Sequence, residues 1–194
     1  MGLFKILTAA KAIADFATDE NTIKAANNIK TLSGEVSEKF RDINGDGGFD
    51  MDDFNWLLET SCMYSSIIGH ISTVDSNEIR EEEMDVAIEI INNICFSEDG
   101  LLNDEVVEFS QLSKKQIRNK VYDKFSTPYS LKKISKYAIN IEKEEEFYSI
   151  AYSIVMADEE VSENEKEFLD IFSKELEFSK FDVRNIERQI KKLL

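Results

Sequence analysis

Residues 54–73 read FNWLLETSCMYSSIIGHIST, and this stretch decides the fold. Phe54, Leu57 and Leu58 follow the i, i+3, i+4 spacing that opens an amphipathic helix. Further apolar residues follow and spread around much of the helix circumference: Cys62, Met63, Ile67, Ile68 and Ile71. A helix with so little polar face usually lies at the centre of a bundle. We therefore predict one long central helix that ends near Thr73.

The composition of the whole chain favours further helices around this one. The 194 residues include a single Pro and seven Gly, and 42% of them are hydrophobic. Glu, Lys, Ile and Leu are abundant, whereas residues that break helices are few. A chain of this length buries a sizeable core within one domain, or within one domain and a small appendage. The predicted fold class is all-α, a helical bundle.

Charge and the lack of targeting signals limit the classes of function. The 39 acidic and 23 basic residues give a net charge of −16, which opposes sequence-independent binding of nucleic acid or anionic lipid. An excess of acidic residues favours the binding of metal cations or of a basic protein partner. No apolar run approaches the ~18 residues of a membrane span, and Lys5 and Lys11 interrupt the short N-terminal apolar stretch. Because Cys62 and Cys95 lie in apolar helical patterns, we predict core thiols and a reducing, cytoplasmic location.

Immediately before the central helix, residues 42–53 read DINGDGGFDMDD and carry the features of a calcium loop. Side-chain oxygens stand at loop positions 1, 3, 5, 9 and 12, on Asp42, Asn44, Asp46, Asp50 and Asp53. Gly47 occupies the position of the sharp turn, and Gly48 can offer its carbonyl oxygen. Phe49, at position 8, is expected to tuck the loop back against the protein. The five carboxylates of this stretch repel one another unless a cation lies among them, so we predict a Ca²⁺ site.

This loop resembles EF-hand and dockerin-type calcium loops, with two departures. Position 12 holds Asp53 rather than Glu, and the shorter side chain weakens bidentate binding of Ca²⁺ and lets Mg²⁺ compete. Arg41 replaces the apolar residue that usually precedes the loop. The alternative interpretation is a solvated turn rich in Asp, Asn and Gly.

The first 41 residues carry small and apolar residues at helical spacing and are predicted to form helices. Thr18 or Asp19 can cap the second of these helices. Residues 1–17 could lie on a membrane surface, as amphipathic helices do, in a weak peripheral contact. These residues carry few positive charges, however, which favours packing against the rest of the protein or against a partner helix. We predict a unit of residues 1–60, with these helices and the loop, and a second unit of residues 61–194.

The second unit contains an internal sequence repeat. Asp75 is followed by Ile79 and an acidic cluster, and Asp158 is followed by Val161 and another acidic cluster. Ser162 and Glu165 also match the pattern of a capping box. Residues 151–169, AYSIVMADEEVSENEKEFL, resemble the signature of the TerB-like (tellurite-resistance-associated) helical domain, which runs roughly Ala-Asp-Gly-x-apolar-x-x-x-Glu. The chain from about Met63 to its end resembles the whole of that domain.

The resemblance implies an all-helical fold of two pseudo-twofold halves, a stress-response or partner-binding role, and metal binding at acidic helix turns. The residues at the matching positions are Asp75, Glu82 and Glu83 in one half and Asp158, Glu163 and Glu165 in the other. Ser76 and Glu159 replace the glycine expected after each Asp, so neither turn has its left-handed residue. The alternative is that these carboxylates cap helices and complement the helix dipole.

Three further segments carry smaller predictions. Residues 113–126, extended by Lys132, Lys133 and Lys136, form the most basic stretch, which should pair with acidic faces of the chain or else dock an acidic partner. Pro128 fits the first turn of the next helix, and the four Glu and one Lys of residues 142–146 suit a solvated helix start. The single histidine, His70, has no triad partners and is predicted to be structural.

Two classes of function follow. The first is a non-enzymatic protein that binds Ca²⁺, and through it fixes the N-terminal helices, and that contacts a protein partner. The alternative is a metal-dependent hydrolase that uses the carboxylates of the two Asp turns. Histidine ligands, a nucleophile with its base and a glycine-rich phosphate loop are all missing from the sequence. Convergence of Asp75 and Asp158 in a concave pocket would favour the enzyme.

Overall fold

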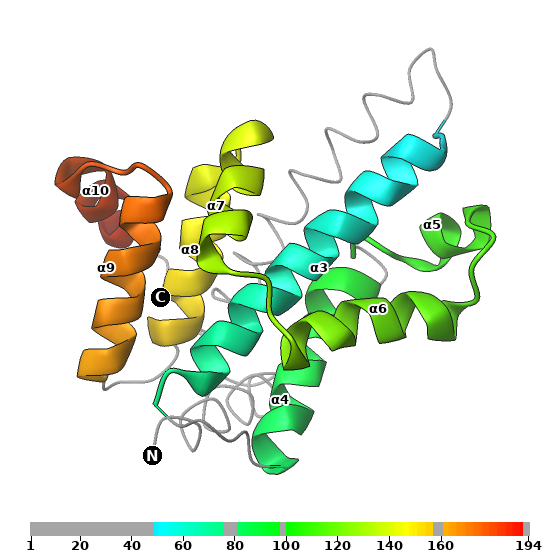
Figure 1. The fold of residues 1–194 in the computed structure, drawn as a ribbon, viewed down its shortest axis with the longest axis horizontal. Coiled ribbons are helices and arrows are strands. Elements are labelled where there is room, and N and C mark those ends of the chain that lie inside the picture. Colours follow the sequence, from blue (N-terminus) through cyan, green and yellow to red (C-terminus); the bar gives the residue numbers. More distant parts are fainter. Residues whose placement is uncertain (1–48, 76–80, 98–99, 157–160, 192–194) are drawn as a thin grey trace.

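A computed structural model of the chain describes residues 49–75, 81–97, 100–156 and 161–191 (Figure 1). The elements in chain order are α3 (Met51–Thr73), α4 (Glu81–Ile91), the π-helical turn η1 (Asn92–Phe96), α5 (Asp104–Phe109), α6 (Lys114–Ser126), α7 (Leu131–Asn140), α8 (Glu144–Met156), α9 (Glu163–Glu175) and α10 (Lys180–Lys191). These residues contain no strand, so the predicted all-α bundle is confirmed for them. None of their helices is long and apolar enough to cross a membrane. The helices and the membrane contact predicted for residues 1–41 lie outside the described residues.

α3 is the central helix of the bundle, as the sequence predicts. It runs diagonally through the molecule, with α4 and α6 on one side and α7 and α8 on the other (Figure 1). Its buried residues occupy every face, and Met63 and Ile67 are fully enclosed. The helix ends at Thr73, as predicted, and Val74 is its C-cap residue.

The predicted boundary between residues 60 and 61 falls within α3. Leu57 and Leu58, before the boundary, belong to the same hydrophobic core as Met63 and Ile67 after it. Residues 51–60 therefore pack as part of one body with the helices that follow. The organisation of residues 1–48 lies outside the described part of the chain.

α3 and α6 approach each other through small residues. A Cβ atom added at Gly69 would lie 2.3 Å from the carbonyl oxygen of Phe125, so only glycine fits there. Four residues earlier, the hydroxyl of Ser65 donates a hydrogen bond of 2.7 Å to the carbonyl of Val121. Because the side chains are this short, the two backbones nearly touch, and α6 closes one side of the core.

Serine caps begin several of the helices. Ser113 and Ser162 each form a capping box, with Gln116 and Glu165, and the predicted Ser162 box is thereby confirmed. Ser130 caps α7, which begins at Leu131. The prediction that Pro128 opens this helix is wrong, because Pro128 lies before the cap and its ring faces Gly69 of α3.

The structural role predicted for the histidine and the core position predicted for the two cysteines are confirmed. The Nε2 atom of His70 lies 2.7 Å from the carbonyl oxygen of Tyr129 and so ties α3 to the loop before α7. Cys62 and Cys95 are free and buried. Burial raises the pKa of Cys62 to about 11 and that of Cys95 to about 12, and both thiols therefore stay protonated at neutral pH.

Candidate functional site

The end of the predicted calcium loop forms the N-terminal cap of α3. Asp50 is the cap residue: its Oδ1 atom accepts from the backbone N–H of Asp52 at 2.7 Å and from that of Asp53 at 3.0 Å. In return, Oδ2 of Asp53 accepts from the N–H of Asp50 at 2.9 Å. Loop positions 9 and 12 are thus locked to each other and to the first turn of the central helix.

Phe49 anchors the same segment, as expected for position 8. Its ring is half-buried and packs edge-on against Phe109 of α5, with 4.9 Å between the ring centroids. Each capping carboxylate uses one oxygen in the cap, so Oδ2 of Asp50 and Oδ1 of Asp53 make no hydrogen bond to a described residue. The donor set therefore fits a hard cation in chemical type.

The remaining predicted ligands, Asp42, Asn44, Asp46 and Gly48, lie outside the described residues. In the part of the chain that the structure describes, no three His, Cys, Asp or Glu side chains gather as a metal site would require.

The structure brings together some of the residues of the second predicted acidic set. Oδ1 of Asp75, just beyond the end of α3, accepts hydrogen bonds of 3.0 Å from the hydroxyl of Ser162 and from the amide of Asn164 at the start of α9. Glu165 is buried and accepts from the N–H of Ser162 at 2.7 Å. The contacts of Asp75 are thus with neutral donors that join two helix ends.

Of the other four members of that set, the structure describes only the side chain of Glu163. Glu163 is exposed and pairs with Lys166 at 2.6 Å. Asp158 and the side chains of Glu82 and Glu83 lie outside what the structure describes. Metal binding at the two Asp turns stays a prediction.

A buried carboxylate lies between α3 and α8. Glu146 is 6% exposed, accepts a hydrogen bond from the hydroxyl of Tyr64 and lies 3.4 Å from the ammonium of Lys143. Burial and the nearby Glu146 carboxylate raise the pKa of Tyr64 well above its usual value. The prediction of a solvated stretch over residues 142–146 is therefore wrong for Glu146, which is held inside by Tyr64.

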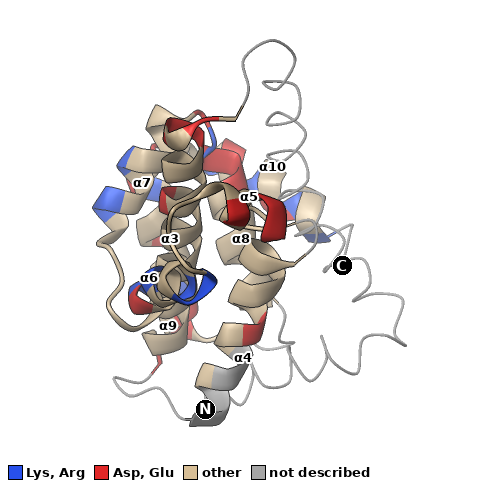
Figure 2. Cartoon of the chain, turned by 90° about the vertical axis from the view of Figure 1, so that its right-hand side faces the viewer, with Lys and Arg blue, Asp and Glu red and all other residues tan. Residues whose placement is uncertain are grey.

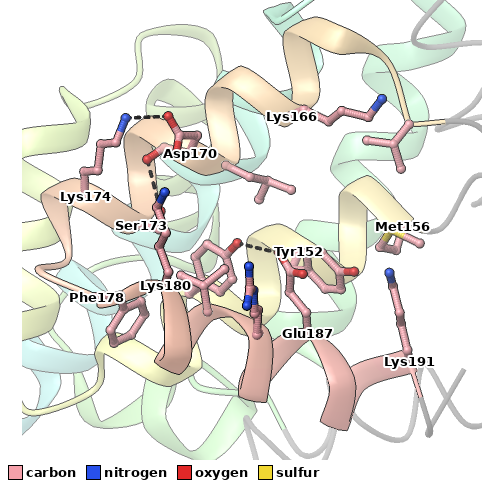
Figure 3. A pocket seen from close by; sticks show the side chains of 15 residues that line it. Tyr152, Met156, Lys166, Asp170, Ser173, Lys174, Phe178, Lys180, Glu187 and Lys191 are labelled. Carbon is pink, nitrogen blue, oxygen red and sulfur yellow. Dashed lines mark hydrogen bonds and ion pairs between the residues drawn. The ribbon is translucent and has the colours of Figure 1, made fainter.

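A groove with a volume of about 660 Å³ lies among α8, α9 and α10 (Figure 3). Its apolar lining comes from Met156, Val161, Leu169, Phe178 and Val183, together with the rings of Tyr148 and Tyr152. These two tyrosines stand one turn apart on α8 and stack, with centroids 6.2 Å apart and ring planes inclined by 16°. Phe178 packs edge-on against Tyr148 at 5.8 Å.

Cations line the groove in excess of carboxylates. Lys166 and Lys174 come from α9, and Lys180, Arg184 and Lys191 come from α10, whereas the carboxylates among the described lining residues are Asp170 and Glu187. Asp170 pairs with Lys174, and Glu187 accepts from the hydroxyl of Tyr148 at 3.2 Å. Burial and the Glu187 carboxylate raise the pKa of Tyr148 far above its usual value, so its hydroxyl stays a donor.

Sequence reasoning missed this groove, although two signals point to it. Tyr148 and Tyr152 have the i, i+4 spacing of one helix face, and Lys180 and Arg184 have the same spacing. Neither pair shows which other helix it faces, and only the fold brings them together.

A second positive region covers α6 and α7 (Figure 2). Residues 110–141 hold eight Lys or Arg residues and a single Asp. Among the described residues, Lys114 pairs with Asp104 at 2.7 Å and Lys133 with Glu59 at 3.3 Å, so the predicted internal pairing is confirmed for part of the stretch. The ammonium of Lys133 also lies 3.3 Å from the ring centroid of Tyr129. Lys132 and Lys136 are exposed on α7.

Comparison with known proteins gives no match: no family model fits the chain, and neither a curated protein nor a solved structure is similar to it. The resemblances to the TerB-like domain and to EF-hand and dockerin loops therefore stay predictions from sequence.

Proposed function

We propose that this chain is a non-enzymatic, divalent-cation-binding helical protein in which residues 42–53 hold Ca²⁺. The ligands would be the side chains of Asp42, Asn44, Asp46, Asp50 and Asp53 and the carbonyl oxygen of Gly48. The observation that carries the proposal is the reciprocal cap of Asp50 and Asp53, which holds loop positions 9 and 12 at the start of α3 and leaves one oxygen on each. Phe49, packed on Phe109, supports it.

Cation binding at this place would stabilise the whole bundle. Two ligands belong to the first turns of α3, and α3 is the helix around which the core is built. An ion that binds only the folded chain adds about 2.7 kcal/mol to the free energy of unfolding at one hundred times its dissociation constant. Because Asp53 is shorter than Glu, Mg²⁺ is expected to compete.

Calcium calorimetry tests this function directly. Wild-type protein should bind one Ca²⁺ and melt at a higher temperature in its presence, and the double variant Asp42→Ala/Asp46→Ala should lose both effects. The matched control is Asp104→Ala/Glu105→Ala, which removes two exposed carboxylates from another helix start and should bind as the wild type does. A wild type with neither binding heat nor a shift in melting temperature would refute the cation site.

A protein partner completes the proposal, in line with the TerB-like resemblance and its stress-response setting. The lysine-rich face of α6 and α7 supports it, because exposed Lys132 and Lys136 suit an acidic surface. The alternative of a carboxylate-based hydrolase lacks such support among the described residues. Asp75 accepts from Ser162 and Asn164, and the groove lining is mainly cationic and apolar.

A further inference from the structure

The groove among α8, α9 and α10 has the size and lining of a small-molecule site. Sites for small ligands usually measure about 300–1,000 Å³ and combine apolar walls with a few polar groups, and this groove measures about 660 Å³. Tyr148 and Tyr152 form one wall, and Leu169 and Val183 contribute apolar side chains from the facing helices. Figure 3 shows Tyr152 and Met156 on one side of the opening and Lys166 and Asp170 of α9 on the other.

The charges around the groove indicate the sign of the ligand. Lys180 and Arg184 stand one turn apart on α10 and form no ion pair with a described residue. Lys191 lies 6.0 Å above the ring of Tyr152, at the other end of α10. The two carboxylates are already engaged, Asp170 by Lys174 and Glu187 by Tyr148. On a chain of net charge −16, such a local excess of cations would attract an anion.

From this combination we propose that the groove binds a monomeric amphipathic carboxylate, with its apolar body along Tyr148, Leu169 and Val183 and its anionic head at Lys180 and Arg184. Apolar walls alone would accept a neutral ligand, and the cations alone would accept a small inorganic anion. A ligand that uses both the apolar walls and the cations must combine an anionic group with an apolar chain. This site is independent of the cation loop, which lies at the start of α3 and shares no residue with the groove.

Calorimetric titration with dodecanoate, kept below its micelle concentration, tests the assignment. We expect one site per chain and weaker binding at high salt, because the head lies among exposed charges. Shortening the chain from twelve carbons to ten should lower the affinity about fourfold per methylene that leaves the groove. Acetate and dodecyltrimethylammonium should not bind, since the first lacks a tail and the second has the wrong charge.

Two pairs of variants locate the site. Lys180→Gln/Arg184→Gln should lower dodecanoate affinity about tenfold, on the basis of about a factor of three per exposed charge. Lys132→Gln/Lys136→Gln makes the same change of charge on α7, away from the groove, and should bind as the wild type does. Val183→Trp fills the groove and should abolish binding, and a melting curve establishes that this variant is folded.

Several outcomes would overturn the proposal. No binding of dodecanoate to wild type would mean that the groove is closed by another part of the chain or accepts another ligand class. If both pairs of glutamine substitutions lowered dodecanoate affinity equally, the effect would come from the net charge of the protein and not from a site at Lys180 and Arg184. Binding to anionic phospholipid vesicles that depends on Lys180 and Arg184, without binding of dodecanoate, would assign the surface to a membrane instead. None of these outcomes bears on calcium binding, which is measured by calorimetry on the same protein in the absence of dodecanoate.

Discussion

The contact between α3 and α6 and the groove among α8, α9 and α10 are two opposite ways of placing helices side by side. At the first, Gly69 and Ser65 are so small that the α3 backbone reaches the carbonyls of Phe125 and Val121. At the second, Tyr148 and Tyr152 project from α8, and about 660 Å³ remains open among the helices. Small residues eliminate space between helices, whereas large rings hold them apart.

The difference explains where this chain has room for a ligand. Close-packed helix contacts leave no void larger than a water molecule and respond strongly to added volume. A groove wall can lose or gain a side-chain group with little effect on folding, because one side of it faces solvent. Substitutions at the first contact should therefore change stability, and substitutions at the second should change binding.

The largest expected effect is at Gly69. Gly69→Ala places a methyl group 2.3 Å from the Phe125 carbonyl oxygen and 2.9 Å from the ring of Pro128, so α3 and α6 must separate. We expect the free energy of unfolding to fall by about 2–3 kcal/mol, the usual cost of overpacking, although alanine favours helices by about 1 kcal/mol.

Urea denaturation measures this change, with Asn119→Ala on the exposed face of α6 as the control for helix propensity. The control should be neutral or slightly stabilising. A Gly69→Ala variant as stable as the wild type would show that the helix contact is not close-packed, and the comparison of the two regions would fail.

A pair of tyrosine substitutions compares the two regions directly. Tyr64→Phe removes one donor from the buried carboxylate of Glu146 and should cost about 1–2 kcal/mol of unfolding free energy, because water has little access to that acceptor. Tyr148→Phe removes a hydroxyl that donates to Glu187 and should cost less than about 0.5 kcal/mol, because the Glu187 carboxylate is partly exposed and can bind water instead.

Denaturant titrations of both variants measure the contrast. The phenylalanine replacement is the same at each position, so the difference reports the surroundings of the hydroxyl alone. Equal costs would contradict the distinction between the buried acceptor Glu146 in the core and the partly exposed acceptor Glu187 at the groove.

The sequence predicts the part of this fold that depends on local pattern. The length and central position of α3 follow from the apolar residues around its circumference, and the Ser162 box follows from a Ser and a Glu three residues apart. Both features depend on neighbours within one helix, where the periodicity of the chain fixes the geometry.

What the sequence does not predict depends on pairs of residues far apart in the chain. Glu146 lies in a run of Glu that looks solvated, and only its contact with Tyr64 places it inside. Pro128 looks like a helix start, yet Ser130 supplies the better cap and the proline ring packs toward Gly69. The groove needs three helices at once, and no periodicity within one of them reveals the others.

The smallest expected difference between two variants concerns the link between the two regions, where Asp75 at the end of α3 meets the start of α9, which forms one wall of the groove. Ser162 both caps α9 and donates to Asp75 at 3.0 Å, whereas Ser130 caps α7 without such a contact among the described residues. Loss of a cap typically costs about 1 kcal/mol of unfolding free energy. We expect Ser162→Ala to cost about 1–1.5 kcal/mol and Ser130→Ala about 0.5–1 kcal/mol, because only the first also removes a donor from a carboxylate.

Thermal unfolding of the two alanine variants, alone and each combined with Asp75→Ala, separates the cap from the link. If the link contributes, Asp75→Ala should cost less in the Ser162→Ala background than in the wild type, and its cost should be unchanged in the Ser130→Ala background. Full additivity in both backgrounds would mean that the Ser162 hydroxyl acts only within its own helix. In that event the contact between α3 and α9 would rest on the hydrogen bond from Asn164 to Asp75 and on packing such as that of Phe168 against His70.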